Sequence, residues 1–246
     1  MNVIVEYSRL QTFLNVAMAV VHECRLRCTE DHLRITATDP AQVAQVETTL
    51  ASDGCESFET DGEVLGINLE KLDDALGFAS TGDLVLLELN TETRKLEIEY
   101  DGFGYDLGLI DPESIRREPD IAEVDFPARI RVYGHRLERG IKGCDLASDH
   151  TRFEADAESG EFRATAEGDT DDVSIRMDSE DLQTDIPEAV SSLFSIGYLT
   201  ELVDPIENDT EVVVKVGDEF PLTWFYELSE GNVAVTNFLA PRIART

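Results

Sequence analysis

The chain has 246 residues, 42% of them hydrophobic, and carries 52 acidic and 20 basic residues, for a formal net charge of −32. This apolar content supports a folded core in one large domain or two of about 120 residues, and it excludes a disordered acidic tail. Acids spread along a folded, lysine-poor chain are typical of adaptation to concentrated salt, where a Debye length of about 3 Å screens self-repulsion; an ordinary acidic protein is the alternative.

The first half of the chain combines helical and strand patterns. Apolar residues three and four apart predict helices over Ser8–Glu23, with Ser8 as the N-cap, and over Leu69–Ala79. Polar and apolar residues alternate in five further segments, which predict antiparallel strands. These segments are Leu33–Thr38, Val43–Leu50, Leu84–Leu89, Lys95–Tyr100 and Tyr105–Ile110.

A stretch with three prolines and mixed charge follows, and it has no clear period. This stretch, residues 111–127, predicts an extended connector over residues 113–126. Its apolar residues Ile115, Ile121, Val124 and Phe126 either fasten it to a sheet or form a recognition strip.

The second half of the chain repeats the first at one constant offset, without a net insertion. At this offset Leu10 aligns with Leu137, and Leu72 aligns with Leu199. Helices are predicted over Gly134–Ala147 and Ile196–Val203. The predicted strands are Arg152–Asp156, Phe162–Ala166, Val173–Met177, Glu211–Val216, Leu222–Leu228 and Val233–Leu239. The sequence therefore predicts an α+β class with two copies of one domain, over 1–112 and 127–246.

Motifs for catalysis, metal binding and membrane insertion are absent from the sequence. It holds no hydrolase, zinc-protease, nucleotide-loop or paired-cysteine signature, so no enzyme activity, cofactor or metal is expected. Cys24 and Cys28 share one face of a strand pattern, which favours buried thiols over half of a metal site. Without an 18-residue apolar run or a signal-like start, we expect a cytoplasmic protein and no membrane partner.

Five segments carry a specific family likeness: Ala37–Val46, Gly66–Leu69, Ile110–Ile121, Glu167–Asp172 and Phe238–Ile243. Through them, and over nearly its whole length, the sequence resembles the sliding DNA clamps of the proliferating cell nuclear antigen (PCNA) family. The resemblance implies a homotrimeric ring whose helices line a hole for duplex DNA. It also implies a non-enzymatic processivity factor that is placed on DNA by a clamp loader. DNA polymerase, nuclease and ligase would bind it through short peptide motifs.

The resemblance also implies two contact surfaces. The subunit interface would pair Phe103, Tyr105, Leu107 and Leu109 of one chain with Val173, Ile175 and Met177 of the next. The partner-peptide pocket would use Thr38, Val43, Ile121, Pro221, Leu222, Phe238, Ala240 and Pro241.

The helices that would face DNA depart from the family, because they carry few lysines. The residues expected to face DNA are Arg9, Lys71, Arg136, Arg139 and Lys142. The last three belong to a basic segment, residues 129–142, which has five bases and one acid. The alternative for this segment is that its bases pair with surface acids.

Three other functions stay open on the sequence alone. An acidic DNA mimic or inhibitor would bind basic proteins through its charge. A hydrolase of the same α+β class would build its site from the acids. A subunit of a heterotrimeric clamp would keep the family fold but need different partners.

Overall fold

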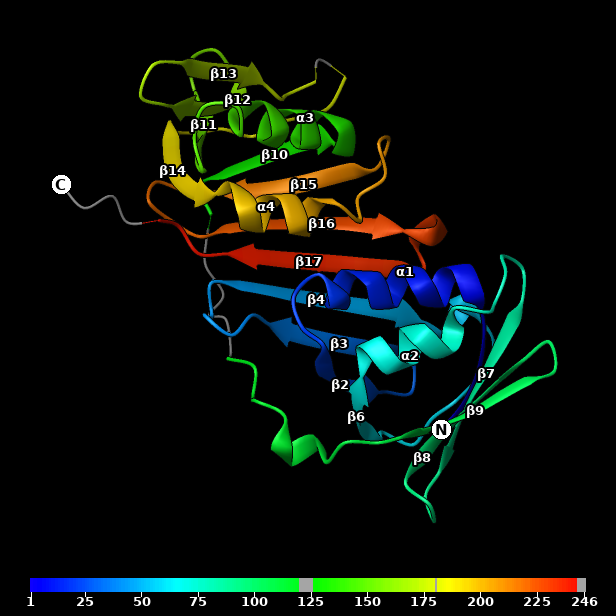
Figure 1. Cartoon of the computed structure of the whole chain (residues 1–246). Helices are drawn as coiled ribbons and strands as arrows, with labels where there is room; N and C mark the ends of the chain where they lie inside the picture. The colour runs from blue at the N-terminus through cyan, green and yellow to red at the C-terminus, as the bar shows by residue number, and fades with distance from the viewer. Residues whose placement is uncertain (120–125, 180, 243–246) are drawn as a thin grey trace. The chain divides into compact units, whose positions relative to one another are not determined.

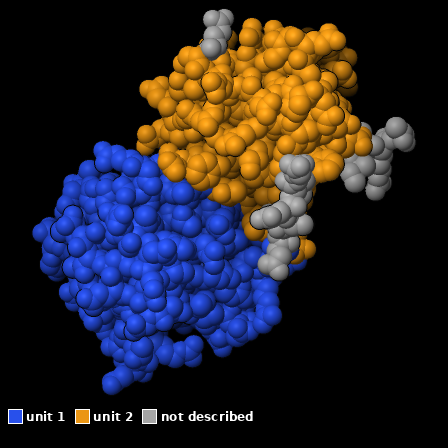
Figure 2. All heavy atoms as spheres, turned by 180° about the vertical axis from the view of Figure 1, so that it is seen from behind, with its two compact units in different colours: residues 1–39, 46–119, 228–235 blue, residues 40–45, 120–227, 236–246 orange. Residues whose placement is uncertain are grey.

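A computed structural model of the chain describes residues 1–119, 126–179 and 181–242. The chain divides into two compact units, coloured separately in Figure 2. Unit 1 comprises residues 1–39, 46–119 and 228–235; unit 2 comprises residues 40–45, 120–227 and 236–246. The strands that begin at Ala44 and Val233 are divided between the two units.

Two helices pack side by side in each unit, over one face of its strands (Figure 1). Their bounds are α1 Tyr7–Met18 and α2 Leu69–Leu76 in unit 1, and α3 Gly134–Cys144 and α4 Ile196–Val203 in unit 2. Helix α1 forms because Leu10, Phe13, Leu14 and Ala17 make one buried stripe. Helix α2 is capped by Asn68, whose Oδ1 accepts the Lys71 N–H at 2.9 Å.

Unit 1 has two antiparallel sheets. Its first sheet contains, in spatial order, β5 (Cys55–Glu59), β1 (Asn2–Glu6), β7 (Leu84–Asn90), β8 (Lys95–Tyr100) and β9 (Phe103–Gly108). Its second set of adjacent strands is β4 (Ala44–Ala51), β3 (His32–Thr38), β2 (Glu23–Cys28) and β6 (Val64–Asn68). Short 3₁₀ turns lie at Ser52–Gly54 and Pro112–Ser114, and a turn with positive φ lies at Ser229–Gly231.

Unit 2 repeats this arrangement. Its first set of adjacent strands is β10 (Ala128–Tyr133), β15 (Glu211–Val216), β16 (Leu222–Leu228) and β17 (Val233–Leu239). Its second sheet is β13 (Asp172–Arg176), β12 (Phe162–Glu167), β11 (His150–Ala155) and β14 (Val190–Ser195).

The strand registers confirm the duplication. Val3 of β1 pairs with Leu87 of β7, and Ile130 of β10 pairs with Val214 of β15. The second pair follows the first at the same offset that aligns Leu10 with Leu137. Helix α3 follows α1, and α4 follows α2, at this offset as well. The chain therefore contains two pseudo-repeated α+β domains.

Helix ends differ from the prediction. The first helix begins at Tyr7, so Ser8 is inside it and is not its N-cap. It ends at Met18 and not at Glu23, and the chain leaves the helix through a 3₁₀-type turn in which the Val20 N–H donates to the Ala17 carbonyl. Glu23 instead starts β2. Helices α2 and α3 also end before the predicted Ala79 and Ala147.

Several strands were not predicted: β1, β5, β6, β10 and β14. They are short, and most of them run directly into a helix, so no turn residue marks their boundary. Among the described helices, none is long and apolar enough to span a membrane.

The cysteines are free thiols, and Cys24, Cys28 and Cys144 are buried. Burial raises the pKa of Cys24 and of Cys28 to about 12, and that of the half-buried Cys55 to about 11. Because the thiolate is the reactive form, we expect native Cys24 and Cys28 to react with iodoacetamide at pH 8 at least about 100-fold more slowly than in the unfolded chain. Mass spectrometry of labelled peptides measures this, with the guanidinium-unfolded protein as control. Equal labelling rates in both states would show the thiols to be accessible.

Candidate partner, assembly and DNA surfaces

Strand β9 lies at one end of its sheet, next to β8. The Leu109 N–H donates to the Arg94 carbonyl at 3.2 Å, so residues of odd number bond to β8 in this antiparallel ladder. The N–H and C=O groups of Gly104, Asp106 and Gly108 consequently point away from β8. This edge can accept another antiparallel strand.

The side chains predicted for this edge divide between core and surface. Leu107 is buried in unit 1, whereas 40% of Tyr105 is exposed. Leu109 is half-buried and follows the strand. Asp106 is paired with Lys95 at 3.0 Å, and both side chains stay largely exposed.

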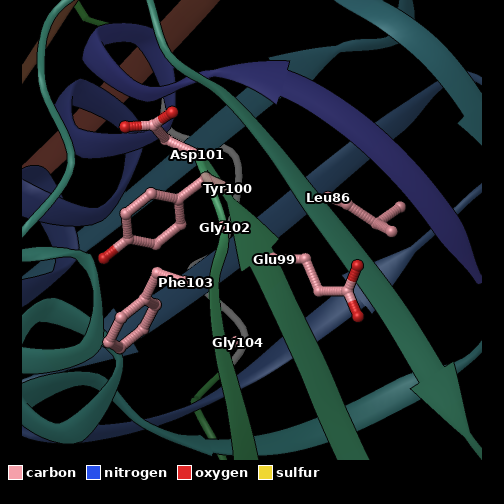
Figure 3. Close-up of a pocket in the computed structure, with 7 residues that line it drawn as sticks. All are labelled: Leu86, Glu99, Tyr100, Asp101, Gly102, Phe103 and Gly104. Atoms are coloured by element: carbon pink, nitrogen blue, oxygen red, sulfur yellow. The ribbon is translucent and has the colours of Figure 1, made fainter.

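An aromatic cluster borders a shallow hollow of about 420 Å³ at the β8–β9 turn. Asp101 and Gly102 both have positive φ there, as a tight hairpin requires. The rings of Tyr100 and Phe103 lie on one side of the hairpin, and Leu86 and Glu99 lie on the other (Figure 3). The Phe103 ring is 5.0 Å from that of Tyr100.

Phe78 extends this aromatic cluster and was missed by sequence reasoning. Its ring centre lies 5.5 Å from that of Phe103, yet 76% of the residue is exposed. The only sequence signal was an aromatic residue directly after the helix-ending Gly77. A large apolar side chain exposed beside an open strand edge is typical of a protein–protein contact.

Strand β13 is the corresponding edge of unit 2, next to β12. Helix α3 packs closely over it, because a Cβ on Gly140 or Gly143 would overlap Met177 or Ile175. Met177 is therefore buried, and Val173 and Ile175 are half-buried. Of these predicted interface residues, the side chains of Ile175 and Met177 face α3, and β13 forms the outer edge of its sheet.

The residues predicted for the partner pocket are partly brought together. In unit 2 the Ala240 N–H donates to the Val43 carbonyl at 2.8 Å, which joins the end of β17 to the segment before β4. Phe238 is half-buried on the outer face of β17. Pro241 follows Ala240 and is also half-buried.

The other predicted pocket residues have different surroundings. Pro221 follows a turn held by Ser192, whose Oγ donates to the Gly217 carbonyl at 2.9 Å. Leu222 is 1% exposed and belongs to the core of unit 2. Thr38 ends β3 in unit 1 and is half-buried, and Ile121 lies outside the described residues.

The bases predicted to face DNA lie on three helices. Lys71 of α2 and Arg139 and Lys142 of α3 are exposed, whereas Arg136 is half-buried. Arg9 of α1 turns its guanidinium toward the protein, where it donates to the Gly54 carbonyl.

Ion pairs occupy some bases of the 129–142 segment. Lys142 pairs with Glu138, which raises the pKa of the lysine through a hydrogen bond and the carboxylate charge. Arg131 pairs with Glu211 across β10 and β15. Arg139 of α3 is exposed, so its charge lies at the surface.

Comparisons with known proteins agree with this geometry. The family model described as "Proliferating cell nuclear antigen, N-terminal domain" matches residues 4–102. The DNA polymerase sliding clamp of Natronomonas pharaonis is 43% identical over 240 residues, which cover 98% of this chain and 97% of that protein. The clamp of Haloarcula marismortui is also 43% identical, with 98% of both proteins covered.

Solved structures match over the whole chain. The structure "C-terminal region of FEN-1 bound to A. fulgidus PCNA" gives a TM-score of 0.92 at 31% identity, covering 100% of this chain and 99% of that one. The PCNA of Thermococcus kodakaraensis gives 0.88 at 21% identity, covering 98% and 99%, and it supports the fold alone.

Proposed function

This chain belongs to the proliferating cell nuclear antigen family of DNA polymerase sliding clamps, and we propose that it works as a ring of three identical chains around duplex DNA. Its function is that of a sliding clamp, a factor that keeps replication and repair proteins on DNA. As in the family, we assign it no reaction of its own. We place it in the cytoplasm, on the nucleoid.

The observation that carries the ring is that, among the described strands, β9 of unit 1 and β13 of unit 2 each end a sheet. An open strand edge can pair with strands of other molecules and lead to aggregation, and proteins normally cover it. Pairing β9 of one chain with β13 of the next, repeated around three chains, satisfies every one of these edges in a closed assembly.

Helices α1 to α4 would line the opening, with Lys71, Arg136, Arg139 and Lys142 nearest the phosphates. So few bases give the clamp little affinity for DNA. In molar salt the small number of bases makes little difference, because the DNA-binding constant falls by about 0.9 log unit per neutralised phosphate for each tenfold rise in salt. A closed ring needs no affinity, since it cannot leave a long duplex sideways.

The clamp is expected to stay on circular DNA and to slide off linear DNA. Trimers would be reassembled in molar salt around covalently closed plasmid, and retention measured by gel filtration. We expect clamps to remain with the circles and to be released when a restriction nuclease cuts them. Equal loss from circles and linear DNA would contradict encirclement and favour the acidic DNA-mimic alternative.

Partner proteins would bind at the connector and the end of β17. The A. fulgidus PCNA structure contains the C-terminal region of FEN-1. By extension, we propose that nucleases, DNA polymerase and ligase present short peptides to Val43, Phe238, Ala240 and Pro241 of this chain. An aromatic or aliphatic side chain of the peptide would anchor in apolar surroundings. The clamp loader would use the same surface.

A further inference from the structure

Arg25 of β2 is a nearly buried arginine whose side-chain hydrogen bonds to the described residues go to residues 112–118, where the connector begins. Its residue exposure is 6%. Nε donates to the Pro112 carbonyl at 2.9 Å, and Nη1 donates to the Arg116 carbonyl at 2.8 Å. Nη2 donates to the Ile115 carbonyl. One guanidinium therefore satisfies three backbone carbonyls of residues 112–116.

The same guanidinium holds a carboxylate slightly further along the chain. Arg25 Nη1 lies 3.0 Å from Glu118 Oε1, and Arg27 Nη2 lies 2.9 Å from Glu118 Oε2. Only 13% of the Glu118 side chain is exposed. Burial works to raise the pKa of Glu118. A backbone hydrogen bond, the hydrogen bonds from Arg27 and Arg25 and the Arg27 charge outweigh it, so the pKa lies below its usual range.

A second fastening lies just before this segment. The Ile110 N–H donates to the Gly66 carbonyl at 2.9 Å, which forms an isolated bridge to β6. A Cβ on Gly66 would overlap the Ile110 carbonyl, so the approach requires glycine. Residues 110–118 are thus held to β6 at one end and to β2 at the other.

We propose that Arg25 is a positioning residue that seats residues 110–118, the described start of the connector, so that a partner peptide meets this segment in an ordered conformation. This role rests on the proposed partner binding at the connector. Because residues 110–118 are already ordered, binding of the partner does not have to lose their conformational entropy. Arginine suits the role because its planar donors reach three carbonyls and a carboxylate at once, which a lysine ammonium cannot do.

The test compares Arg25→Met, Arg25→Lys and Arg117→Met. Arg117 is the matched control, since it lies in the same segment but pairs with Glu113 at the surface, where its side chain is 83% exposed. The probe is a peptide of the FEN-1 C-terminal region, and binding is measured by fluorescence anisotropy in molar salt. Hydrogen exchange of residues 110–118 and trimer mass are measured in parallel.

We expect Arg25→Met to weaken peptide binding by about tenfold and to speed exchange in residues 110–118, because immobilising a released segment carries an entropic penalty. Arg25→Lys should fall between the methionine variant and the unmodified protein, and it remains the test if the methionine variant does not fold. Arg117→Met should bind normally. All variants should stay trimeric.

Two failures are distinguishable. If the unmodified clamp does not bind the peptide, the proposed partner surface is wrong and this role falls with it. If the clamp binds but both Arg25 variants bind equally well, the partner surface stands and the positioning role is overturned.

Discussion

Replacing Asp106 with proline is expected to convert the trimer to folded monomers of 27.3 kDa. Asp106 lies in the middle of β9, and its N–H points away from β8, toward the neighbouring chain of the proposed ring. Proline lacks this donor and places a ring where the partner strand must approach. Within the monomer the substitution is tolerated, because proline is accepted on edge strands whose N–H faces outward.

The loss of affinity between subunits should be large, because the proposed ladder between β9 and β13 is short. One missing donor leaves a carbonyl of the partner's β13 without its hydrogen bond, which costs about 1–3 kcal/mol. The pyrrolidine ring of the proline also keeps neighbouring hydrogen bonds between the strands from forming. Each increment of about 1.4 kcal/mol is tenfold in the dissociation constant, so a shift of at least about 100-fold is expected.

Asp106→Ala is the matched control. It removes the same carboxylate and its exposed pair with Lys95, which contributes about 0–1 kcal/mol, but it keeps the backbone N–H. Light scattering after gel filtration in molar salt gives the mass of each variant, and circular dichroism checks the fold. A proline variant that remains trimeric would exclude β9 as the subunit edge.

The repeat and most strands were predictable because their signals are local. Strands β8, β15, β16 and β17 and helix α4 have the predicted bounds, since alternation and helical spacing depend only on neighbouring residues. The constant offset between the halves then transfers each element of one half to the other. Helix ends were less predictable, because they depend on contacts between distant parts of the chain. After the turn at Val20 and Val21, Glu23 pairs with Asn68, which is far away in the sequence.

The contact surfaces depend on three-dimensional packing, which a pattern does not carry. Alternation places Met177 and Ile175 on one face of a strand, but only the glycines of α3 show that this face is covered by a helix. Arg25 reads as an ordinary polar position in an alternating strand. Its bonds reach residues 112–118, which are far away in the sequence, so no local signal announces them.

Replacing Phe238 with aspartate is expected to weaken binding of the FEN-1 peptide by about 100-fold while the trimer persists. Phe238 lies on the outer face of β17, two residues before Ala240, whose N–H donates to the Val43 carbonyl. An aromatic anchor at the centre of an interface commonly contributes about 2 kcal/mol or more. A carboxylate in its place must lose water against an apolar peptide side chain, which adds a desolvation penalty.

Thr236→Asp supplies the control, because Thr236 lies on the same outer face of β17 and is exposed. Both variants add one negative charge to a chain of net charge −32. In molar salt, with a Debye length of about 3 Å, repulsion at a distance is screened equally in the two. A difference between them therefore reports desolvation at the contact itself. Equal losses would point to general charge effects, and no loss from Phe238→Asp would place the partner surface elsewhere on the clamp.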